Sequence, residues 1–275
     1  NLLGKNPKAD YIHTGIWSEK ALKEAQRYGE INIVEAGTTL NGKLAIKDQS
    51  EWSLSQDAAY VHYADNETIG GLQFAGVPEV NAPLVSDLSS SILSAPIDVS
   101  KFGLIYAGAQ KNIGPAGLTI VIVRDDLLDQ SRSEIPSILK YSAQAKNDSM
   151  VNTPATYSWY LSGLVFEWLL EQGGVEAIHQ VNLEKAKLLY GYIDASDFYN
   201  NPIAEANRSI MNVPFTLADE ALEKLFLKEA EENHLLNLAG HRSVGGMRAS
   251  IYNAVPLEGV QALVNFMDDF ARRNG

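Results

Sequence analysis

The 275-residue sequence contains no cysteine, which excludes disulfides, thiolate catalysis and cysteine-ligated zinc together. Basic residues are few, since 22 Lys and Arg stand against 34 Asp and Glu, so we expect no nucleic-acid partner. Hydrophobic runs of membrane-spanning length are absent, and the five histidines show no metal-ligand spacing. These absences favour a cytoplasmic protein that binds neither a metal nor a membrane.

The residues that are present favour an α/β fold. Hydrophobic residues make up 45% of the chain, enough for one large core or for two domains. Short apolar segments alternate with helical ones, and such alternation is typical of a mainly parallel sheet with helices on both faces. We predict a helix at 19–28, capped by Ser18, and strands at 10–15, 31–36, 58–63, 80–87, 104–107 and 118–123.

The pattern changes after residue 150. Helical periodicity predicts two long helices, at 154–171 and 175–192, separated by a Gly-Gly pair. A strand at 209–217, a helix at 220–233, strand-like pieces within 240–252 and a last helix at 258–273 follow. We therefore predict a large domain at residues 1–178 and a smaller C-terminal α+β domain at residues 179–275.

The segment from Leu104 to Gly117 carries one lysine, Lys111, from the end of a predicted buried strand into a glycine-rich turn. Ligands of open α/β sheets bind beyond the carboxyl ends of the strands. A desolvated lysine there has a lowered pKa, and its neutral amine can attack a carbonyl. A solvated loop lysine is the alternative, and this segment alone leaves both open. The glycines do not form a phosphate-binding P-loop, so nucleotide hydrolysis is not expected.

Three further residues follow predicted strands and could share a ligand with Lys111. Asp87 ends one strand, where a carboxylate could hold a pyridine nitrogen protonated, the partner that pyridoxal phosphate needs while a lysine forms its Schiff base. Trp17 could lie flat on an aromatic ring, and Thr68 could bond a ring hydroxyl or a phosphate. The structural alternatives are a strand-end or cap carboxylate, a core tryptophan and a turn threonine.

Two other segments suit anions. Asn152 and Thr153 precede a proline at a predicted helix start, where Thr153 is the expected cap and where exposed N–H groups also suit a phosphate. His241, Arg242 and Arg248 gather around a Gly-Gly pair in a chain otherwise short of basic clusters. Arginine matches carboxylates and phosphates in two-point contacts, so this segment indicates an anionic substrate unless it is an ordinary solvated turn.

Taken together, these segments resemble the phosphoserine aminotransferases, a family of fold-type I pyridoxal-phosphate enzymes within the class V aminotransferases. The resemblance covers essentially all 275 residues. The segments that carry it are 9–11, 66–68, 87–90, 106–117, 152–154, 207–209, 240–242 and 246–253.

The resemblance implies pyridoxal 5'-phosphate as cofactor and transfer of an amino group between L-glutamate and 3-phosphohydroxypyruvate, giving 2-oxoglutarate and O-phospho-L-serine. In bacteria the family commonly also handles 4-phosphohydroxy-L-threonine. A homodimer with sites at the subunit interface is expected. The implied roles are the cofactor Schiff base for Lys111, the pyridine nitrogen for Asp87, ring stacking for Trp17, cofactor contacts for Thr68 and Gln110, the partner's cofactor phosphate for Asn152 and Thr153, and substrate anions for His241, Arg242 and Arg248.

The chain departs from the family pattern at its start. Family members carry an N-terminal segment with a His-Arg pair for the substrate and a glycine-rich loop for the cofactor phosphate, and this segment is not among the 275 residues. A chain without them is expected to retain cofactor weakly and to transaminate little. Another class V pyridoxal-phosphate enzyme, or a truncated non-catalytic form, is the alternative; a cysteine desulfurase is disfavoured because the chain has no cysteine.

Overall fold

A computed structural model describes residues 1–4 and 6–275. Its larger sheet consists of β1 (Lys8–His13), β2 (Glu30–Glu35), β5 (Val61–Ala64), β8 (Leu84–Asp87), β9 (Leu104–Gly108) and β10 (Thr119–Val123). The spatial order is β10-β9-β8-β5-β1-β2. All neighbouring pairs are parallel except β10 and β9, so the predicted α/β fold with a mainly parallel sheet is confirmed.

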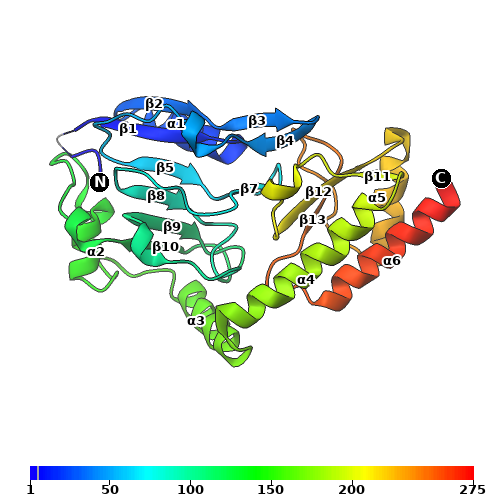
Figure 1. Cartoon of the computed structure of the whole chain (residues 1–275). Coiled ribbons are helices and arrows are strands. Elements are labelled where there is room, and N and C mark those ends of the chain that lie inside the picture. The colour runs from blue at the N-terminus through cyan, green and yellow to red at the C-terminus, as the bar shows by residue number, and fades with distance from the viewer. Residues whose placement is uncertain (5) are drawn as a thin grey trace.

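The smaller sheet contains β11 (Tyr199–Asn200), β12 (Asn212–Leu217) and β13 (Met247–Ser250), all antiparallel. Figure 1 shows this sheet beside the long helices α4 (Gly174–Asp194) and α6 (Leu257–Asn274), with α5 (Glu223–Glu232) at the far end. A hydrophobic core that includes Phe215, Phe226 and Phe270 joins these elements. The predicted boundary between residues 178 and 179 falls inside α4, and the division into two domains stays a prediction.

The remaining α-helices of the described residues are α1 (Ile16–Ala25), α2 (Tyr141–Lys146) and α3 (Thr156–Glu171). The left-handed φ of Gly173, +94°, separates α3 from α4, as the Gly-Gly pair predicts. The predicted cap of α3 is wrong: Ala155 precedes the helix, and no side chain caps it. Thr153 lies too far ahead of the first helical turn to bond its N–H groups.

The start of α1 also differs from the prediction. Gly15, not Ser18, occupies the cap position. The Ser18 hydroxyl oxygen instead accepts hydrogen bonds from the backbone N–H groups of Thr14 and Gly15, at 2.9 Å each, so it reaches back toward the loop from inside the first turn.

Two hairpins were not predicted from the sequence. The first joins β3 (Gly37–Leu40) to β4 (Lys43–Ile46) through Asn41 and Gly42, whose φ values of 51° and 78° are those of a tight two-residue turn. The second, β6 (Asn66–Glu67) with β7 (Leu72–Gln73), follows β5 directly. Within the described residues, no helix is both long and apolar enough to cross a lipid bilayer.

Candidate active site

A small cavity of about 120 Å³ lies beyond the carboxyl ends of β5, β8 and β9. We call it the Lys111 cavity. Its position follows from the sheet, because parallel neighbouring strands end at the same edge. It brings together five of the residues singled out from the sequence and adds three others. The lining residues are Trp17, Asn66, Thr68, Asp87, Ser89, Ser90, Gln110 and Lys111.

Lys111 sits in a tight turn just after β9. Its backbone N–H and that of Gly114 both donate to the carbonyl of Ala109, at 2.7 Å, which folds the chain back on itself. The Lys111 amine donates to the Thr68 hydroxyl at 2.8 Å. It also lies 5.9 Å from the centre of the Trp17 ring. Side chains from helix α1 and from the residue after β6 thus meet at the amine of Lys111.

The pKa of Lys111 is lowered to about 8, mainly by burial. The negative charges of Asp87 and Glu67 oppose this shift, whereas the positive charge of Arg248 adds to it. At neutral pH a larger fraction of the amine is therefore neutral than in an exposed lysine. A lysine of this kind can act as a nucleophile toward a carbonyl and as a base.

Asp87, at the end of β8, accepts a hydrogen bond from the N–H of Ser89 at 2.8 Å. Within strands β9 and β5, which flank β8, Tyr106 and His62 are joined by a 2.9 Å hydrogen bond, and His62 stacks on Tyr11 of β1. Burial lowers the pKa of His62 to about 4, partly opposed by the charge of Asp87. Burial and the Asp87 carboxylate both raise the pKa of Tyr106. His62 and Tyr106 are therefore uncharged at neutral pH. Neither of them provides a positive charge that would pair with Asp87.

The three predicted substrate residues are not equally placed. An Nη of Arg248 donates to the backbone oxygen of Thr68 at 3.3 Å, which puts this arginine in contact with a residue that lines the cavity. Arg248 Nε is buried and has no hydrogen-bond partner in the part of the chain that the structure describes. His241 bonds Ser243 at 2.7 Å, and Arg242 is exposed. None of the three is among the residues that line the Lys111 cavity.

Asn152 and Thr153 are exposed and line a different hollow, together with Trp159 and Tyr160 of α3. Their expected contact is with a partner subunit, so a single chain does not test it. Among residues 1–4 and 6–275, no group of three or more His, Cys, Asp or Glu could hold a metal ion.

The class-V aminotransferase family model matches residues 1–263. Phosphoserine aminotransferase of Acinetobacter baylyi is 90% identical over the whole chain, which spans 77% of that relative. The chain belongs to the phosphoserine aminotransferases of class V. The aminotransferase is thus a transaminase that depends on pyridoxal phosphate, as the sequence predicted.

Other comparisons agree with this assignment. The phosphoserine aminotransferase of Pseudomonas putida is 63% identical over 276 residues and is covered to 76%. Among solved structures, the phosphoserine aminotransferase of Bacillus circulans subsp. alkalophilus is 46% identical, with a TM-score of 0.95 over 100% of this chain and 76% of that one. The pyridoxal-phosphate-bound enzyme of Trichomonas vaginalis is 41% identical, with a TM-score of 0.92, covering 98% and 77%.

The residues of the Lys111 cavity fit pyridoxal phosphate. They offer an amine for its aldehyde, a carboxylate for its ring nitrogen and the flat face of Trp17 for its ring. Asn66 lines the same cavity, and its buried side-chain oxygen has no hydrogen-bond partner among the described residues. Buried polar groups are normally satisfied, so an acceptor left open here is consistent with a ligand.

Sequence reasoning gave no role to Asn66, Ser89 and Ser90. The signal was present, because each lies within three positions of a residue that was singled out and follows β5 or β8. Asn66 donates to the Ser90 hydroxyl and to Asn212, both at 2.9 Å, and so links two strand ends to the smaller sheet.

Proposed function

We propose that the Lys111 cavity is where the aminotransferase exchanges an amino group between L-glutamate and 3-phosphohydroxypyruvate. The products are 2-oxoglutarate and O-phospho-L-serine. The observation that carries this proposal is that Lys111, Asp87 and Trp17 line one small cavity at the carboxyl edge of the sheet. These are the amine, acid and aromatic face that the cofactor's reactive groups require.

When bound, pyridoxal phosphate supplies an aldehyde that condenses with amines and a ring that withdraws electrons from the substrate. Lys111 would hold that aldehyde, and its Nζ would move a proton between the substrate's α-carbon and the cofactor, in one direction in each half-reaction, a task suited to a pKa of about 8. Asp87 would hold the proton on the ring nitrogen, and Thr68 and Gln110 would orient the cofactor.

Substrate anions are assigned to the basic residues. Both substrates carry a second anionic group, a carboxylate in glutamate and a phosphate in the keto acid, and arginine accepts either. Arg248 is the best supported of the three, because its buried Nε has no partner among the described residues. His241 and Arg242 join it if their loop closes on the substrate. 4-Phosphohydroxy-L-threonine, which also carries a phosphate, is proposed as a second substrate.

We also propose a homodimer. The outer face of α3 exposes apolar side chains, among them Tyr160, Leu164 and Leu170. The same helix contacts the turn after Lys111, since the Ser158 hydroxyl donates to the carbonyl of Ala116 at 2.8 Å. A second copy covering this face would place Asn152 and Thr153 near a subunit interface. The cytoplasmic location stays a prediction.

An assay of acceptor preference tests the proposal. The native protein, with any residues that flank these 275, is given L-glutamate and either 3-phosphohydroxypyruvate or hydroxypyruvate, and the products are measured by mass spectrometry. We expect O-phospho-L-serine and a clear preference for the phosphorylated acceptor that Arg248→Gln reduces. Lys111→Ala should lower turnover by roughly 10²-fold or more. Equal use of both acceptors, or full turnover without Lys111, would contradict the proposal.

A further inference from the structure

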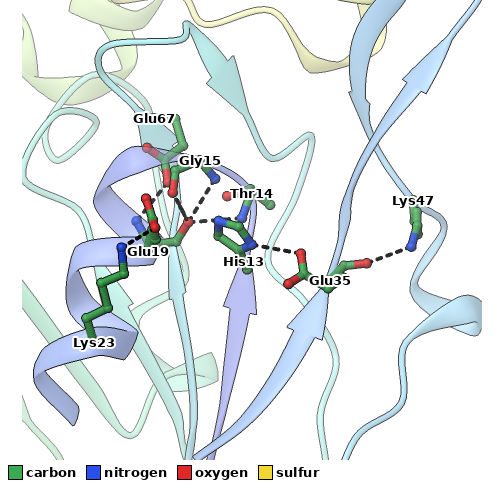
Figure 2. A network of polar contacts seen from close by, with 9 residues as sticks. His13, Thr14, Gly15, Glu19, Lys23, Glu35, Lys47 and Glu67 are labelled. Atoms are coloured by element: carbon green, nitrogen blue, oxygen red, sulfur yellow. Dashed lines mark hydrogen bonds and ion pairs between the residues drawn. The ribbon is translucent and has the colours of Figure 1, made fainter. Parts of the chain in front are cut away.

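Glu67 is a buried carboxylate with no part in the mechanism above. It is the last residue of β6, and Thr68 follows it directly. Glu67 is almost fully buried, with 2% of its surface exposed. One carboxylate oxygen accepts a hydrogen bond from the N–H of Trp17 at 2.8 Å. The other accepts from the N–H of Ser18 at 2.9 Å and from its hydroxyl at 2.7 Å. Figure 2 shows Glu67 beside Gly15 at the start of α1.

The two N–H groups belong to the first turn of α1, where a helix leaves its backbone donors without internal partners. A side chain at the cap position usually accepts these bonds, but Gly15 occupies that position and has no side chain. Glu67 takes over the role from a distant part of the chain. Its negative charge also suits the positive end of the helix dipole.

Gly15 makes room for this arrangement. A Cβ added to Gly15 would lie 2.7 Å from the carboxyl carbon of Glu67, closer than such contacts allow. The glycine and the carboxylate are thus two halves of one junction. The junction ties α1, which carries Trp17, to the end of β6, which is followed by Thr68.

The two residues that this junction ties together, Trp17 and Thr68, both lie beside the Lys111 amine. Thr68 accepts a hydrogen bond from the Lys111 amine, and the ring of Trp17 lies beside the same amine. Glu67 also acts on the lysine through its charge, which raises the pKa of Lys111 against the effect of burial. The Glu67 carboxylate therefore helps to position Trp17 and Thr68, and its charge raises the pKa of Lys111.

We propose that Glu67 is a positioning residue, which holds the Trp17 indole and the Thr68 hydroxyl in fixed register beside the Lys111 amine. Its side chain is not among those that line the Lys111 cavity. The inference rests on the proposed function, because it assigns the register of a cavity taken to hold the cofactor.

Glu67→Gln tests the proposal. The amide keeps one acceptor oxygen but turns an NH₂ group toward backbone donors, and it removes the charge. We expect pyridoxal phosphate to bind about tenfold more weakly, because one or two charge-assisted hydrogen bonds of Glu67 are lost. Quenching of Trp17 fluorescence by the cofactor should also fall, measured as the difference from a Trp17→Phe background.

The pH dependence separates positioning from mere helix stability. Loss of the Glu67 charge should lower the pH at which Lys111 becomes reactive toward an amine reagent, because the charge raises the lysine pKa in the parent protein. Gly15→Ala displaces the carboxylate but keeps its charge. It should weaken cofactor binding with a smaller change in that pH, and it serves in place of Glu67→Gln if the latter fails to fold.

The matched control is Glu19→Gln, on the same helix, whose carboxylate is paired with Lys23 at the surface. We expect no change in cofactor affinity or in Lys111 reactivity. The proposal is overturned if Glu67→Gln and Gly15→Ala bind cofactor and quench Trp17 as the control does. If instead the parent protein fails to attach cofactor at Lys111, it is the proposed function that fails.

Discussion

Lys111 differs from the surface lysines of this chain through its burial and its neighbours. Burial disfavours its charged form, and Arg248 disfavours it further, so the pKa falls to about 8. The pKa of an exposed lysine is about 10.4. A group whose pKa is lowered loses its proton at lower pH, so the neutral, reactive amine of Lys111 is present through pH 8 to 10, where the surface lysines remain charged.

The first prediction concerns this difference. In cofactor-free protein, the rate of Lys111 modification by an amine-directed reagent should rise with a midpoint near pH 8. Arg248→Gln removes a positive neighbour and should move that midpoint to higher pH. Peptide mass spectrometry across a pH series measures both, with the exposed Lys20 as internal reference. Coincident profiles for Lys111 and Lys20 would contradict the account.

At the residue scale, the sequence predicted which side chains meet at Lys111 but not what holds them. Asp87 and Thr68 follow apolar strands, and strand ends of a parallel sheet converge, so their grouping follows from local patterns. Glu67 bonds Trp17 across 50 positions of the chain, and no local pattern signals such a contact. His241 and Arg242 match the family pattern, yet their loop lies outside the cavity, so their role stays a prediction.

At the scale of elements, α4 fixes the segment that follows β13. Lys185 of α4 is fully buried, and its amine donates to the backbone oxygens of Ile251, Tyr252 and Val255 at 2.9 to 3.0 Å. From the same segment, the N–H of Asn253 donates at 3.0 Å to the side chain of the residue after Lys111. One helix thus connects the smaller sheet to the turn that carries the reactive lysine.

The second prediction tests this connection. Lys185→Met keeps the length of the side chain but leaves three backbone oxygens without their donor, so the free energy of unfolding should fall by about 2–4 kcal/mol. Lys187→Met, at an exposed position of the same helix, should change it by no more than about 0.5 kcal/mol. Urea denaturation measures both. Equal effects of the two substitutions would show that the Lys185 contacts contribute little.

The elements themselves were predicted unevenly. Strands of the larger sheet and the long helices carry strong periodic patterns, and their existence follows from them. The β3–β4 hairpin was missed although Asn41 and Gly42 form a strong turn signal. The start of α1 was placed at Ser18 because serine is a common cap, whereas its true cap group comes from Glu67, a tertiary contact.

At the scale of the whole molecule, the exposed face of α3 is the feature that one chain leaves unexplained. Several apolar side chains of α3 are exposed, and the helix contacts the turn after Lys111. Figure 1 shows α3 at the outside of the molecule. Large exposed apolar patches commonly mark interaction surfaces. A second copy of this chain is the partner we propose, because the expected sites lie at a subunit interface.

The third prediction follows from this surface. Leu164→Asp, on α3, should convert the dimer to a monomer, because a carboxylate would be buried without a partner in the interface. Leu225→Asp, on α5, provides the control, since the two leucines are similarly exposed, at 41% and 38%. Sedimentation velocity measures the change. A monomeric parent protein, or a dimer that survives Leu164→Asp, would refute this interface.

The central claim is that Lys111 holds the aldehyde of pyridoxal phosphate. The most direct test is to reduce the cofactor-loaded protein with borohydride, digest it and locate the cofactor mass by peptide mass spectrometry. The account predicts a single modified peptide with the cofactor on Lys111, and none in Lys111→Ala. Stoichiometric attachment to a different lysine, in protein that transaminates normally, would contradict it.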